Sequence, residues 1–170
     1  DWSSDVCSSD LGFGMSREIT SFRHAVMLLG LKKLFRWAVL LMTTSPTDVT
    51  GPVVGNAAVV RGRLMELLAS ELLPLEDCDN AFVTGVFSLL DRMLGIPMGE
   101  ALNSISLPEA VVEALLQQKG KLAPFLELTL ACETADDDAF ARSANALNLS
   151  NQQVNWAHLQ ALAWTDEITA

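Results

Sequence analysis

Residues 54–72, VGNAAVVRGRLMELLASEL, give the clearest structural signal in this 170-residue chain. Apolar side chains recur there at three- and four-residue intervals, which is the spacing of one face of a helix. That face comprises Val54, Ala57, Ala58, Leu64, Met65, Leu68 and Leu72. The stretch therefore predicts a helix that buries one side in a core.

Arg61 lies in the middle of this apolar face. A lone charge is costly to bury, so the side chain should find a partner or reach out to water. Asp91 borders the apolar face of a helix that we predict over residues 81–94, and we name it as the partner. The hypothesis is a direct or water-bridged Arg61–Asp91 ion pair with a structural role, and exposure of Arg61 to solvent is the alternative.

The same spacing predicts helices elsewhere in the chain. We expect them over residues 21–29, from 31 to the Ser45–Pro46 stop, over 106–118, 124–133 and 136–147, and from 150 onward. Residues 74–79 are predicted to form a loop, and residues 98–103 a short turn. No segment alternates apolar and polar residues over the length of a strand. The predicted fold class is an all-α helical bundle.

Composition narrows the class of protein. Half of the residues are apolar, which is enough for a core, and the net charge of −10 argues against broad nucleic-acid binding. No apolar run reaches the roughly 18 residues of a membrane span. Cys78 and Cys132 form no close pair of metal-binding or redox spacing, so we expect a reduced, cytoplasmic setting.

A small basic group stands out against this acidity. Lys32, Lys33 and Arg36 fall opposite the apolar face of their predicted helix, so they form a possible interaction surface for an anionic partner. The alternative is that they face the acidic part of the same chain or a domain that precedes it.

The sequence offers little for catalysis. The histidines, His24 and His158, are not followed by Asp, and neither has a second histidine at metal-binding spacing. Phosphate-binding loops and a nucleophile elbow are both absent from the sequence. Asp136, Asp137 and Asp138 suit the start of a helix. We expect no catalytic residue, no metal and no cofactor.

Residues 1–11, DWSSDVCSSDL, look like the translation of a common sequencing adapter. We expect them to be non-native, so that residues 12–170 form one domain that is incomplete at its N-terminus.

Two segments resemble HDOD domains, the catalytically degenerate relatives of HD phosphohydrolases. The first is FGMSREITS at residues 13–21, followed by Ala25 and by Leu28–Gly30. The second, VFSLLDRMLGIPM at residues 86–98, is similar to the subgroup in which HDOD follows an EAL domain, a type associated with cyclic di-GMP. Val60–Arg61 also fits that subgroup. The resemblance implies an HD-like helical fold, a signalling role and an upstream EAL domain as partner.

The leading hypothesis is thus a non-enzymatic signal-transduction module that acts by contacts with other protein domains. One alternative is a fragment of a metal-dependent HD-type phosphohydrolase. Another is a structural domain that forms a homo-oligomer.

Overall fold

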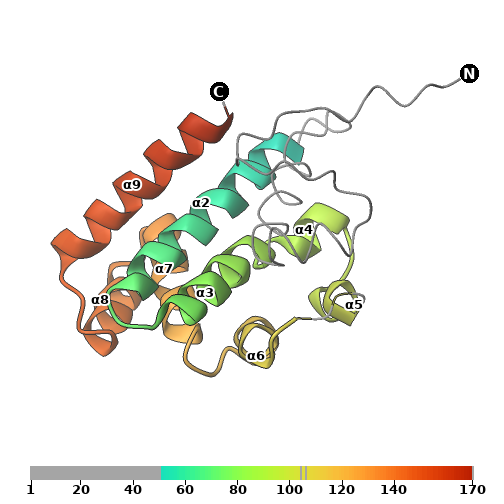
Figure 1. Cartoon of the computed structure of the whole chain (residues 1–170), viewed down its shortest axis with the longest axis horizontal. Coiled ribbons are helices and arrows are strands. Elements are labelled where there is room, and N and C mark those ends of the chain that lie inside the picture. Colours follow the sequence, from blue (N-terminus) through green and yellow to red (C-terminus); the bar gives the residue numbers. More distant parts are fainter. Residues whose placement is uncertain (1–50, 104, 106, 170) are drawn as a thin grey trace, which may run out of the picture. The chain divides into compact units, whose positions relative to one another are not determined.

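The computed structural model describes residues 51–103, 105 and 107–169, and the regular structure within these ranges is entirely helical (Figure 1). This confirms the predicted all-α class. None of the described helices combines the length and apolar character needed to cross a membrane. The predicted helices before residue 51 lie outside the described part. The helices are α2 (Gly51–Ser70), α3 (Leu75–Phe87), α4 (Leu90–Leu94), α5 (Met98–Asn103), α6 (Glu109–Gln117), α7 (Ala123–Thr134), α8 (Asp137–Ala146) and α9 (Asn151–Thr169).

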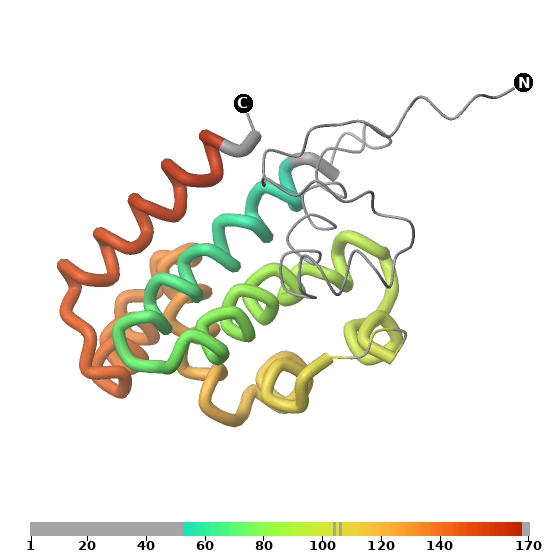
Figure 2. The backbone as a smooth tube through the Cα atoms, in the orientation of Figure 1, coloured from blue at the N-terminus to red at the C-terminus, as the bar shows by residue number. Residues whose placement is uncertain are grey.

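Helix α2 is the central element of the described residues. It packs against α3, α7 and α9, and Figure 2 shows it running between α9 and α3. Most of its predicted apolar face is at least partly buried, with Leu64, Met65 and Leu68 each at most 1% exposed. Leu72 was also predicted to lie on this face, and this is wrong, because it follows the end of α2 and is 46% exposed. Because α2 contacts α4 as well as these three helices, a change in its position affects the packing of most of the described bundle.

Two glycines allow α2 and α3 to cross with their backbones in contact. A Cβ atom at Gly85 would lie 2.7 Å from the carbonyl carbon and oxygen of Arg61 and from the Cα of Gly62. A Cβ atom at Gly62 would lie 2.9 Å from the carbonyl oxygen of Phe82. Real Cβ atoms do not approach backbone so closely, so only glycine fits at either position.

The described helices share two groups of buried apolar side chains. The larger group joins α2, α3, α6, α7, α8 and α9, and its biggest fully buried side chain is Phe125. The smaller joins the first half of α2 to α3, α4 and α5 around Phe82 and Phe87. Helix α2 contributes to both groups, so it connects the two halves of the core.

Helix α9 lies on α2 through a row of mostly small side chains. Val154, Ala157, Ala161 and Thr165 are buried, as the sequence predicts. The apolar spacing after residue 150 predicts that Leu162 shares this face with them, and this is wrong, because the side chain is 43% exposed. When a helix has apolar residues on two sides, their spacing alone does not determine which side is buried.

A second difference concerns the segment before residue 94. The predicted loop at 74–79 belongs mostly to α3, which begins at Leu75 directly after Pro74. Glu76 and Asp77 occupy its first turn, where carboxylates complement the helix dipole. The predicted helix over 81–94 is interrupted at Ser88, whose hydroxyl donates to the carbonyl oxygen of Gly85 at 2.6 Å.

The helix crossing gives the first prediction. Gly85→Ala forces a methyl group against the backbone of α2, so we expect a net loss of about 2 kcal/mol in the free energy of unfolding. Urea unfolding followed by circular dichroism measures it. Gly99→Ala is the matched control, because a Cβ atom there meets nothing within 4 Å. We expect this control to be neutral or to gain up to about 1 kcal/mol from helix propensity. Equal stability of the two variants would contradict the close crossing.

Candidate functional site

Arg61 is the most connected polar side chain of the described residues. Its Nε and Nη2 donate to the two carboxylate oxygens of Glu133 on α7, each at 2.6 Å. Its Nη1 donates to the hydroxyl of Ser88, beyond the end of α3, at 2.9 Å. The Arg61 side chain is 10% exposed and that of Glu133 is 30% exposed. One guanidinium thus joins α2, α3 and α7 through a two-pronged, charge-assisted contact.

Of the two alternatives that the sequence left open for Arg61, pairing and exposure to solvent, the structure shows pairing, but with a partner other than the one proposed. The carboxylate that takes the guanidinium belongs to Glu133, while the half-buried Asp91 sits on α4. Glu133 was overlooked because 72 residues separate it from Arg61. Its position among the apolar residues of α7 was the available signal. Spacing within one helix contains no information about which other helix faces it.

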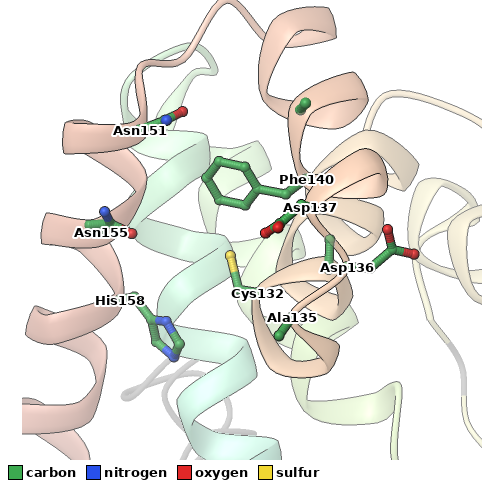
Figure 3. Close-up of a pocket in the computed structure, with 10 residues that line it drawn as sticks. Cys132, Ala135, Asp136, Asp137, Phe140, Asn151, Asn155 and His158 are labelled. Atoms are coloured by element: carbon green, nitrogen blue, oxygen red, sulfur yellow. The ribbon is translucent and has the colours of Figure 1, made fainter.

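The second feature is a cavity of about 450 Å³ between α7, α8 and α9. Figure 3 shows Asn151, Asn155 and His158 projecting from α9 on one side, with Cys132 and Phe140 opposite. The lining residues are Ala131, Cys132, Ala135, Asp136, Asp137, Phe140, Ala141, Asn151, Asn155 and His158. The mixture of amides, carboxylates and one aromatic ring suits a small polar ligand.

The cavity lacks an activated nucleophile. Burial raises the pKa of the Cys132 thiol above its usual value of 9.0, and the neighbouring Glu133 charge raises that pKa further. A protonated thiol is a poor nucleophile. Asp136 is engaged in the fold, because its Oδ1 accepts from the amide nitrogen of Ala139 at 2.9 Å and so caps α8. That cap agrees with the helix-start interpretation of the Asp136–Asp138 run.

Within the described ranges, no group of three or more His, Cys, Asp or Glu side chains is arranged to hold a metal ion. His158 has no such cluster around it, and His24 lies outside the described residues, as does the predicted basic surface of Lys32, Lys33 and Arg36. The predicted interaction surface therefore stays a prediction.

A second ion pair fixes the other end of α3. Lys121 Nζ lies 2.6 Å from Asp77 Oδ1, and the Asp77 side chain is 12% exposed. Lys121 precedes α7, so this contact holds the entry to α7 against the first turn of α3. Apolar spacing in the sequence does not indicate this pair.

The Arg61 contacts give a second prediction. Arg61→Met leaves the Glu133 carboxylate unpaired, and we expect a loss of about 2 kcal/mol in unfolding free energy, below the value for a fully buried pair because Glu133 is partly hydrated. Glu133→Gln should cost about 1 kcal/mol, and the double variant should cost less than the sum. Asp91→Asn is the control and should change stability by less than about 0.5 kcal/mol. A larger effect at Asp91 than at Glu133 would restore the partner named from the sequence.

The thiol environment gives a third prediction. The raised pKa means that the folded state favours protonated Cys132. Its contribution to stability is complete below the unfolded-state pKa and is lost as pH rises through the folded-state pKa. The stability difference between the wild type and Cys132→Ala should therefore shrink as pH rises beyond 9.0. Urea unfolding at a series of pH values measures this difference, and a constant difference would refute it.

Comparisons with known proteins were made for the whole chain. No family model matches it, and no solved structure matches it. The chain is 25% identical over 154 residues to a Vibrio cholerae protein named cyclic di-GMP phosphodiesterase CdgJ, covering 91% of this chain and 36% of that protein. It is 26% identical over 153 residues to the uncharacterised Bacillus subtilis protein YuxH, covering 88% of this chain and 37% of YuxH. The chain is thus similar to just over a third of the length of each of these two relatives.

Proposed function

We propose that this chain is a non-enzymatic module of a cytoplasmic cyclic di-GMP signalling protein, of HDOD type and preceded by an EAL domain. The observation that carries the proposal is the similarity to part of a protein named as a cyclic di-GMP phosphodiesterase. A module that matches only 36% of such a protein leaves ample length for a separate catalytic domain.

The use of the polar side chains supports a role in contacts. Among the described charged groups with the least exposure, Arg61 joins α2 to α7 through its ion pair, and Asp77 joins α3 to the turn that precedes α7. Such contacts fix helix positions, so they maintain a defined surface. The free thiols of Cys78 and Cys132 support a reducing compartment.

The proposed mechanism works through helix packing. Helix α2 contacts α3 through bare backbone at Gly62 and Gly85, and it holds α7 through Arg61 and Glu133. A partner that displaces one of these helices therefore moves α2 and, through it, the others. The module transmits the state of the adjoining domain as a change in the exposed helix surfaces.

The rival function is metal-dependent phosphodiester hydrolysis by this chain itself, which the name of the Vibrio relative favours. The two functions differ in metal content. Hydrolysis of this kind needs several His and Asp side chains around a bound ion, whereas a contact module needs none.

The test is to incubate the purified full chain with iron, manganese or zinc, remove free metal, and measure bound metal and cyclic di-GMP hydrolysis together. We expect metal well below one ion per chain and no hydrolysis above the buffer rate. His158→Ala is measured alongside the wild type, because His158 is the histidine that lies within the described residues and could bind a metal ion. Stoichiometric metal with hydrolysis that His158→Ala abolishes would establish the rival function.

The relay has its own test in the longer native protein. Arg61→Met in that protein should change cyclic di-GMP turnover by the preceding domain at least twofold, because the variant loosens the contact between α2 and α7. Asp91→Asn is the matched control and should leave turnover unchanged. Unaltered turnover in Arg61→Met, with the variant folded, would refute the relay.

A further inference from the structure

Large apolar side chains lie exposed among amide side chains on the side of α9 that faces away from α2. Trp156 is 63% exposed, Leu159 60% and Leu162 43%. Gln152, Trp156, Leu159, Ala163 and Asp166 follow one another at intervals of four, three, four and three residues. This is the spacing of a coiled-coil seam, in which a straight row of side chains faces a second helix. Scattered exposed apolar residues are ordinary, but a row in register is not.

The charge pattern of α9 identifies the kind of partner. The whole chain has a net charge of −10, yet residues 151–165 contain no Asp, Glu, Lys or Arg. Two copies of an acidic chain repel one another over most of their surfaces. An uncharged face is where such copies can approach. A strongly basic partner would find no carboxylate along this stretch, so the pattern fits a second copy better.

We infer that the outward face of α9 pairs with the same face of a second copy, with the two helices antiparallel. A twofold axis near Leu159 sets the two Leu159 side chains together. It places Trp156 of one copy opposite Leu162 of the other and next to Ala163, whose small side chain leaves room for the indole ring. It also places Gln152 opposite Asp166 of the second copy, where an amide N–H can donate to a carboxylate. A parallel pair would instead bring Asp166 against Asp166.

The size of the face sets the strength of the pair. Helix α9 is about 28 Å long for its 19 residues, and one face of a helix is about 10 Å wide. The area of this face, its length multiplied by its width, is well below the roughly 800 Å² per partner of a stable interface. The pair is therefore a weak, reversible dimer whose population depends on protein concentration. The inference does not rest on the proposed signalling function.

The test is sedimentation velocity of the full chain at concentrations from about 5 to about 500 µM, since mass action drives a weak dimer. Wild type should shift from monomer toward dimer. Leu159→Asp brings two carboxylates together at the axis and should remain monomeric throughout. Leu116→Asp, at a 47% exposed position on α6, is the matched control and should dimerise like wild type. Circular dichroism and the unfolding midpoint confirm that each variant is folded.

A second pair of variants tests the orientation. Gln152→Lys sets an ammonium group opposite Asp166 of the second copy and should tighten the dimer at least threefold, whereas Gln152→Glu should weaken it by a similar factor. A parallel pair predicts that both variants weaken the dimer, because two lysines or two glutamates would then meet at position 152. Monomer at every concentration for wild type would overturn the inference and leave this face to another domain of the longer protein. Equal dimerisation of Leu159→Asp and wild type would overturn it as well.

Discussion

The described fold depends on the close crossing of α2 and α3, where two helix backbones touch without side chains between them. Gly62 and Gly85 make this possible, since a methyl group at either position would collide with backbone of the other helix. The crossing has a chemical consequence one residue away. Because α2 lies so near α3, the guanidinium of Arg61 reaches Ser88, where α3 has just ended, while its other nitrogens reach α7. The placement of Arg61 beside Ser88 and its pairing with α7 therefore both depend on the close crossing of α2 and α3.

Burial of that guanidinium shows how the chain uses its few interior charges. A charge removed from water is tolerated only if its hydrogen-bonding groups are satisfied. Arg61 meets the condition with both oxygens of Glu133 and the Ser88 hydroxyl. Its groups are then engaged in holding three helices together. The pair therefore fixes the positions of these helices relative to one another.

The sequence predicted the class of fold and most helix positions, because apolar spacing reports directly on which side of a helix is buried. It also placed Arg61 in the core. It could not name Glu133, because pairing between helices depends on their crossing angles and not on spacing within either one. The interruption at Ser88 escaped notice, since apolar residues continue on both sides of it. The cavity near Cys132 and His158 was likewise beyond sequence reasoning, because residues from three helices line it.

Helix α9 has apolar side chains on its outer side as well as its inner side, and the outer ones bear on its role. Its inner side consists of Val154, Ala157, Ala161 and Thr165, which are small enough to let the helix lie close on α2. Folding therefore needs no large apolar residue on this helix. Trp156 and Leu159 nevertheless occupy its outer side, where they add nothing to the core and favour aggregation unless covered. Because the stability of the bundle does not account for Trp156 and Leu159 on the outer side, we attribute these residues to the contact with a second copy.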